Sequence, residues 1–215
     1  MLQTSSQECP FDWFFFDFGG VIAEEGFVNG LKSLARAERI DPEIMRNTGI
    51  ETVFSTGFVV GKEDEGTFWR ELRKKTGLEA GDDFCRKTIL DGFVLRPWML
   101  EIVHRLREQG RKCAILSDQV SWLDILEERY GFFQQFDRVF NSFHVGKSKR
   151  DPSIFTDVVS LVGTTADRSV FIDDSQDNVQ RAQEQGLTTI HYRSKDDFLH
   201  RLYRLCPSLP TELKG

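Results

Sequence analysis

The sequence has few cysteines and no long apolar run. Its four cysteines, Cys9, Cys85, Cys113 and Cys206, are widely scattered and form no CxxC pair. This scatter argues against a zinc site or a disulfide framework, so we expect reduced thiols in a cytosolic protein. No stretch approaches the ~18 apolar residues that span a membrane. The segment from Met1 to Pro10 also lacks the basic and apolar regions of a signal peptide.

The sequence also lacks a strong excess of one charge sign. The net charge of −6 argues mildly against nucleic acid or an anionic membrane as partner. An apolar fraction of 40% and a charged fraction of 29% are those of a soluble globular protein. The 215 residues suit one domain with an insertion or two small domains. We expect a cytoplasmic monomer or homodimer whose partner is a small molecule.

One apolar run ends in a carboxylate. Phe11 to Phe16 is followed by Asp17, and then by Phe18-Gly19-Gly20. Such a run reads as a strand buried on both faces, and its carboxyl end lies where open α/β sheets bind ligands. There Asp17 could be a nucleophile or a metal ligand, because the glycines after it let a substrate approach the backbone. Alternatively, Asp17 only caps a turn.

Three later segments favour the functional reading. One apolar segment ends in Ser117 and another ends in the pair Asp173-Asp174, while a basic loop, 146–152, carries Lys149. If the strands are parallel neighbours, these groups and the first carboxylate converge at one edge of the sheet. Together they supply a nucleophile, a hydrogen-bond donor, a cation and a site for a divalent metal.

The order and content of these segments resemble the haloacid dehalogenase superfamily of aspartate-nucleophile hydrolases. The resemblance runs from about residue 11 to about residue 200. The segments similar to the four family motifs are Phe16–Val21, Leu116–Asp118, Lys149–Phe155 and Phe171–Asn178. The third departs from the commoner form Lys-Pro-Asp-Pro. Each motif is short, but four in order make a specific signal.

The resemblance implies an α/β fold with a doubly wound parallel sheet, in a Rossmann-type core, and a small all-helical cap. We assign residues 1–23 and 95–215 to the core and 24–94 to the cap. The alternation of strand and helix patterns after residue 95 independently predicts such a sheet. Within 24–94, apolar residues recur at helical spacing, and Asp41-Pro42 reads as an N-cap followed by a helix start.

By the same resemblance, Asp17 attacks a phosphorus atom and forms an aspartyl-phosphate that water hydrolyses. Mg²⁺ between the carboxylate and the phosphate removes their repulsion. Its ligands would be Asp17, the main-chain carbonyl of Gly19 and Asp174, with Asp173 holding a water, although the roles of the acidic pair could be exchanged. Capping of the following helix is the alternative for this pair, but Ser175 can also do that.

The remaining site residues would bind the substrate. Lys149 would neutralise charge on the transferring phosphoryl group and pair with the nucleophile, and Ser117 would donate a hydrogen bond to a phosphoryl oxygen. Gly20 and Asp118 complete the substrate-binding set, although Asp118 could instead contact the loop. Asn178 looks like a support for the acidic pair.

Gly19 is the departure that matters, because phosphatases of this superfamily usually carry an acid–base Asp there. That group is worth ~10²–10⁴-fold in rate. The chain could therefore be slow, or prefer good leaving groups, or use another residue such as Glu24 or Glu25. The form Asp-x-Gly-x-Val is similar to sugar-1-phosphate phosphatases, which favours an enzyme. The alternatives are 2-haloacid dehalogenation, which needs neither acid nor metal, and a metal-binding module without turnover.

Overall fold

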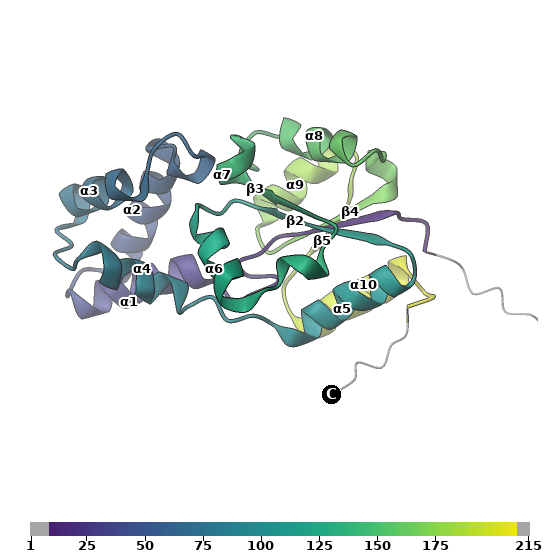
Figure 1. Cartoon of the computed structure of the whole chain (residues 1–215), viewed down its shortest axis with the longest axis horizontal. Coiled ribbons are helices and arrows are strands. Elements are labelled where there is room, and N and C mark those ends of the chain that lie inside the picture. The colour runs from purple at the N-terminus through teal and green to yellow at the C-terminus, as the bar shows by residue number, and fades with distance from the viewer. Residues whose placement is uncertain (1–8, 210–215) are drawn as a thin grey trace, which may run out of the picture.

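The computed structural model describes residues 9–209, and its centre is a parallel sheet in the order β3-β2-β1-β4-β5 (Figure 1). Most of the segment 1–10, which lacks the features of a signal peptide, lies outside the described residues. The strands are β1 (Trp13–Phe16), β2 (Lys112–Ser117), β3 (Arg138–Asn141), β4 (Ser169–Asp173) and β5 (Thr188–His191). Every pairing is parallel. The predicted α/β class is therefore confirmed.

Helices cover both faces of the sheet, as the doubly wound prediction requires. The side chains of β1 show why this strand is central, because Phe14 and Phe16 pack into one apolar cluster and Phe15 into another. On the first face lie α5 (Pro97–Glu108), α6 (Trp122–Tyr130) and α10 (Lys195–Leu205). On the second lie α8 (Ser153–Leu161) and α9 (Gln176–Glu184). Short connecting turns are α7 (Ser142–Val145), η2 (Phe133–Gln135) and η3 (Ala166–Arg168).

A helical insertion follows β1 and forms the left-hand part of Figure 1. Asp41 begins its second helix by accepting the N–H groups of Glu43 and Ile44, as the Asp-Pro pair predicts. The elements of the insertion are α1 (Gly26–Ala37), α2 (Pro42–Ser55), η1 (Phe58–Val60), α3 (Glu65–Thr76) and α4 (Asp82–Leu90). The domain boundaries at 24 and 94 stay a prediction.

An aromatic cluster joins the insertion to the core. Trp122, the first residue of α6, stacks on Trp69 of α3 with ring centroids 5.7 Å apart. Phe27, Phe58 and Phe68 of the insertion surround the same indole. The indole N–H groups of both tryptophans donate to the carboxylate of one glutamate on α3, so neither is left unpaired. This packing fixes the insertion over the end of the sheet.

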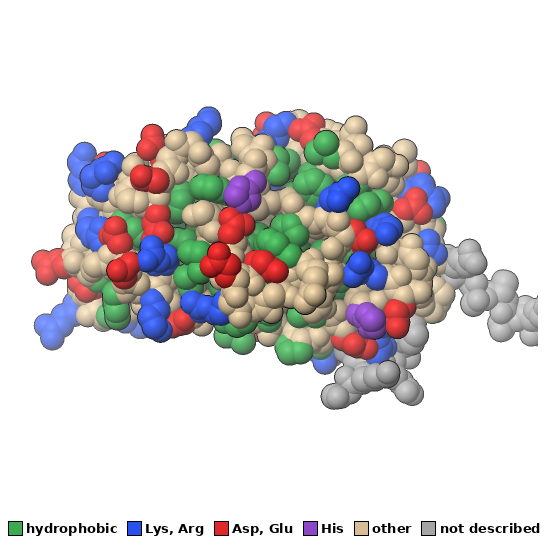
Figure 2. All heavy atoms as spheres, in the orientation of Figure 1, with side chains coloured by type: hydrophobic (Ala, Val, Ile, Leu, Met, Phe, Trp, Pro, Cys, Tyr) green, Lys and Arg blue, Asp and Glu red, His purple; other side chains and the backbone are tan. Residues whose placement is uncertain are grey.

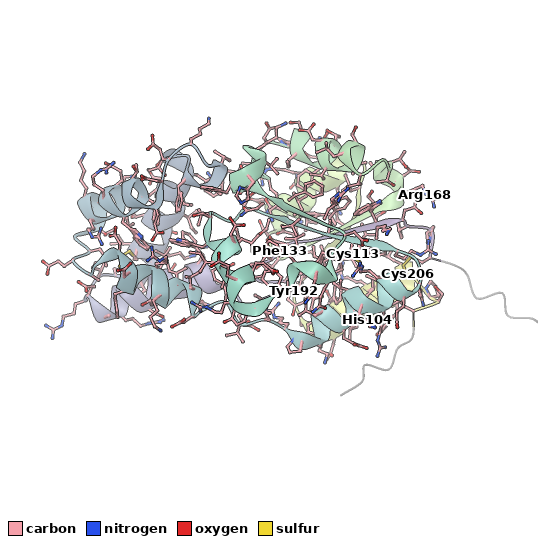
Figure 3. The ribbon with its side chains drawn as sticks, in the orientation of Figure 1. His104, Cys113, Phe133, Arg168, Tyr192 and Cys206 are labelled. Carbon is pink, nitrogen blue, oxygen red and sulfur yellow. A yellow bond between two sulfur atoms is a disulfide. The ribbon has the colours of Figure 1, made fainter. Side chains whose placement is uncertain are left out.

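One expectation from the cysteines is wrong. Cys9 and Cys206 form a disulfide, although 197 positions separate them in the sequence. Cys206 follows α10, at the end of the sheet remote from the insertion, where the chain enters β1 (Figure 3). The fold brings the two together, and no local spacing could show it. Cys85 and Cys113 are free and buried.

Helix α8 begins at Ser153, and Asp151 accepts the N–H of Ser153. No helix within residues 9–209 is both long and apolar enough to cross a bilayer. On the face shown in Figure 2, acidic and basic side chains are interspersed rather than segregated.

Replacing Trp122 by alanine tests how much the aromatic cluster contributes to stability. We expect Trp122→Ala to lower the free energy of unfolding by ~3–5 kcal/mol, because the indole is fully buried and leaves a cavity. Urea denaturation followed by circular dichroism measures this. The control is Leu161→Ala, at a side chain that is 70% exposed, which should change stability by less than ~0.5 kcal/mol. Equal effects of the two variants on the free energy of unfolding would show that the aromatic cluster does not stabilise the fold.

Candidate active site

The carboxyl ends of the three central strands bring the predicted residues together. Phe16 is in register with Ile115 of β2 and Ile172 of β4, so the residues that follow lie side by side. The hydroxyl of Ser117 donates to Oδ1 of Asp17 at 2.7 Å. The N–H of the next residue in the chain donates to the same oxygen at 2.7 Å. Asp17 is only 9% exposed and is held by donors rather than by solvent.

Lys149 is buried beneath these carboxylates. Its ammonium group lies 2.9 Å from Oδ2 of Asp17 and 2.6 Å from Oδ2 of Asp173. Burial opposes its charge, but the Asp17, Asp173 and Asp118 carboxylates outweigh burial and raise the pKa of Lys149. The lysine is therefore a fixed cation. Asp118 accepts the backbone N–H of Lys149 at 2.8 Å, and so holds the loop that delivers it.

The two members of the acidic pair have different surroundings. Asp173 is fully buried and accepts hydrogen bonds from Lys149, from the N–H of Ser175 and from the amide of Asn178. Burial raises the pKa of Asp173, whereas all three neighbours are donors and favour its carboxylate. The side chain of Ser175 does not cap α9, so Asp173 serves that helix start as well.

Asp174 is more exposed than Asp173 as a whole residue, but its carboxyl group lies against the site and borders the cavity described below. Burial of its carboxyl group and the nearby charge of Asp17 raise the pKa of Asp174 to about 6. Oxygens of Asp17, Asp173 and Asp174 all lie within 4.8 Å of one another. Such a set of hard oxygen ligands suits a divalent cation such as Mg²⁺. The cation would also relieve the repulsion among the carboxylates.

The two glycines of the first motif differ in what they provide. Gly20 has φ of +78°, and a Cβ there would lie 2.1 Å from Oδ2 of Asp174. Its carbonyl accepts from Arg96, and it does not line the cavity. Gly20 is thus required by the backbone and by the close approach of Asp174. Gly19 has an ordinary φ, lines the cavity and faces a different neighbour.

That neighbour is Glu25. A Cβ on Gly19 would lie 3.1 Å from Oε2 of Glu25, so the glutamate occupies the space that a side chain at position 19 would enter. Its other oxygen accepts the N–H of Val28 at the start of α1. Burial, together with the charges of Asp174 and Asp17, raises the pKa of Glu25 to about 7. Sequence reasoning named Glu25 only as one of several substitutes for the missing acid.

A cavity of about 300 Å³ lies over these strand ends. Its floor includes Asp17, Gly19, Ser117, Lys149 and Asp174, and its roof comes from the helical insertion. The roof residues were not predicted, because apolar residues of the insertion read equally well as its core. Arg150, next to the buried lysine, places its guanidinium 3.4 Å from the ring centroid of Phe54 on α2. A cation and a ring at this distance attract each other, so this pair links the core to the insertion at the cavity.

Comparison with known proteins agrees with this architecture. Residues 11–186 match the haloacid dehalogenase-like hydrolases, and the chain belongs to that family. A stretch of 77 residues is 36% identical to drimenol cyclase of Aspergillus calidoustus, covering 36% of this chain and 14% of that protein. Over 120 residues it is 25% identical to flavin mononucleotide hydrolase 1 of Arabidopsis thaliana, covering 54% and 49%. The chain thus spans less than half the length of these curated relatives.

Among solved structures, the fold is similar to a haloacid dehalogenase family enzyme of Bacteroides thetaiotaomicron. The two superpose with a TM-score of 0.70 at 20% identity, over 89% of this chain and 98% of the other. That enzyme was solved in complex with magnesium and inorganic phosphate. At this identity the likeness establishes the fold alone.

The raised pKa of Glu25 has a consequence for stability. Because the folded protein holds this proton up to about pH 7, while the unfolded chain releases it near 4.5, stability should fall as pH rises through that interval. With EDTA present at pH 8, Glu25→Gln should therefore raise the free energy of unfolding by ~2 kcal/mol, allowing for partial exposure. At pH 5 the gain should nearly vanish. Urea titrations at both pH values measure it.

The control for this experiment is the adjacent Glu24, whose pKa is lowered by its hydrogen bonds to Arg96. Its carboxylate stabilises the fold above pH 4.5, so Glu24→Gln should not increase stability at pH 8. A gain for Glu25→Gln that is the same at pH 5 and pH 8 would show that the cost of ionising Glu25 in the folded protein is not its cause.

Proposed function

We propose that this protein is a Mg²⁺-dependent phosphatase that forms an aspartyl-phosphate on Asp17. The observation that carries the proposal is the arrangement around this carboxylate. Ser117 and Lys149 contact its two oxygens, and the exposed Asp174 stands beside it. The arrangement offers a nucleophile, two donors for phosphoryl oxygens and a divalent metal site. The family match and the related enzyme solved with magnesium and inorganic phosphate support it.

The residues present fit the metal. Asp17, Asp174 and the carbonyl of Gly19 would hold Mg²⁺, with Asp173 in an outer position because Lys149 already occupies its carboxylate. When bound, the metal supplies charge that removes the repulsion between the attacking carboxylate and the phosphate. Lys149 alone cannot balance three carboxylates, which is why a second cation is expected here.

In the first step, a carboxylate oxygen of Asp17 forms a bond to phosphorus and the bond from phosphorus to the leaving oxygen breaks. The electron pair remains on that oxygen, which takes a proton from the carboxyl group of Glu25. In the second step, water attacks phosphorus and gives a proton back to Glu25, while the bond to Asp17 breaks and phosphate is released. Lys149 and Ser117 stabilise the charge on the phosphoryl oxygens throughout.

Glu25 supplies the group that Gly19 lacks. Its carboxyl group occupies the space beside position 19, and burial, the main cause of its raised pKa, favours the protonated form that gives a proton to a leaving group. This weakens the dehalogenase alternative, since a halide leaving group needs no acid there. The binding-module alternative also loses support, because its basis was the absence of an acid–base residue.

The nucleophile assignment is tested by Asp17→Asn. We expect Mg²⁺-dependent release of phosphate from p-nitrophenyl phosphate to fall by at least about 10³-fold, with folding intact. Omitting Mg²⁺ in the presence of EDTA should abolish wild-type release. The matched control is Asp12→Asn, since Asp12 precedes β1 and pairs with Arg168 away from the cavity. Unchanged release by Asp17→Asn would refute the assignment.

The role of Glu25 is tested by the dependence of rate on the leaving group. We expect Glu25→Gln to lower kcat/KM for an alkyl phosphate by ~10²–10⁴-fold, because an alkoxide needs a proton to depart. For p-nitrophenyl phosphate the loss should be less than about 10-fold, since p-nitrophenolate leaves without help. Glu24→Gln serves as the control.

A carboxylate introduced at position 19, in place of that of Glu25, extends this test. Gly19→Asp combined with Glu25→Ala should recover part of the alkyl phosphate activity that Glu25→Ala loses. Gly19→Asp alone should not raise activity, because the new carboxylate would crowd Glu25. If Glu25→Gln lowered kcat/KM equally for both leaving groups, Glu25 would not be the acid that protonates the leaving oxygen.

A further inference from the structure

The two sides of the cavity have opposite chemistry. Its floor carries the carboxylates and Lys149 described above, whereas its roof is apolar. The roof side chains come from α1, α2 and η1 and are Phe27, Val28, Ile50, Val53, Phe54 and Val59. Among the described residues of the insertion that line the cavity, Glu25 alone is polar, and it faces the floor. The other polar residues of the lining, among them Gln119, Arg150 and Arg181, belong to the core, so a leaving group that is directed toward the insertion meets apolar side chains.

The backbone of the roof offers little to a polar leaving group. Ile50 lies in the middle of α2, where main-chain N–H and C=O groups bond to one another, and the N–H of Val28, in the first turn of α1, is taken by Glu25. A hydroxyl group placed there would lose its water and find no partner, which costs binding free energy. An alicyclic or aromatic group would instead gain from leaving water.

The roof is also held in place. Arg150 stacks on Phe54 from the core side, and it follows directly the lysine that reaches the floor. The hydroxyl of Ser142 donates to the carbonyl of Val59 at 2.6 Å, which ties a second roof residue to the core. Together with the aromatic cluster around Trp122, these contacts restrict movement of the insertion. The insertion therefore cannot readily rotate to bring a polar side chain toward the substrate.

Resting on the proposed phosphatase function, we propose that the cavity selects small phosphate esters with an apolar leaving group of about one ring, and rejects sugar and polyol phosphates. A volume of about 300 Å³ is at the small end of ligand sites, which span ~300–1,000 Å³. The first motif's likeness to sugar-1-phosphate phosphatases points the other way. The roof, which contacts the leaving group, decides against it.

The test compares cyclohexyl phosphate with myo-inositol 1-phosphate, which share a six-membered ring and differ in ring hydroxyls. We expect the wild-type enzyme with Mg²⁺ to show kcat/KM about 10²-fold higher for the cyclohexyl ester. This preference would oppose the intrinsic chemistry, because the hydroxyl groups of inositol make it the better leaving group. Equal values, or a preference for the inositol ester, would overturn the inference.

Roof variants assign the preference to specific residues. Ile50→Asn and Val28→Ser each place a polar group in the roof and should reduce the preference by about 10-fold. Ile44→Asn lies on the same helix as Ile50, is 57% exposed and does not line the cavity, so it should leave the preference unchanged. If all three variants behaved alike, the roof would not set the selectivity.

Release of p-nitrophenol from p-nitrophenyl phosphate, lost in Asp17→Asn, reports on the proposed function separately. If it occurs without the cyclohexyl preference, the substrate inference alone fails. If no ester is cleaved, the phosphatase proposal fails, and the two ring esters then serve as stable ligands. Calorimetry with wild-type protein and Mg²⁺ should still show tighter binding of the cyclohexyl ester. Binding of neither ester, or of both equally, would overturn the inference as well.

Discussion

The ammonium group of Lys149, 1% exposed and within 2.9 Å of Asp17 and Asp173, is the constraint on which the site depends. Without this cation, two carboxylates at the ends of adjacent strands would face each other in a region that excludes water. Breaking a buried pair of this kind costs ~3–5 kcal/mol. The lysine reaches this position because Asp118 accepts its backbone N–H and Asn178 helps to hold Asp173. The strands, the loop and the start of α9 are thus fixed around one charge.

The same charge balance explains why the site is poised for a metal. One lysine faces several carboxylates, and the excess negative charge contributes to raising the pKa values of Asp174 and Glu25. A divalent cation would compensate that excess. Glu25 adds to the repulsion, yet it provides a carboxylate where Gly19 has no side chain. In the proposed mechanism the proton donor stands at the start of α1 and not within the first motif.

The roof illustrates how packing and specificity depend on each other. The aromatic cluster around Trp122 anchors the insertion, and the stack of Arg150 on Phe54 places the insertion against the loop that bears Lys149. In the proposed function the floor would bind the phosphate common to all esters, so discrimination among substrates would fall to the roof. Its apolar side chains are chemically unlike a sugar, and this contrast, rather than the motifs, suggests the class of substrate.

By itself the sequence determined which strands carry the polar site residues. The apolar runs end in Asp17, Ser117 and Asp173, and they predict a parallel sheet buried on both faces because they leave no polar face for solvent. The sequence also predicted the helix start at Asp41-Pro42, because capping is a local interaction. Tertiary structure alone decided the rest. The pairing of Cys9 with Cys206, the approach of Glu25 to Gly19 and the apolar roof all join segments distant in sequence or oriented only by packing. Local sequence patterns do not predict such contacts, because the packing of the whole core sets the long-range geometry.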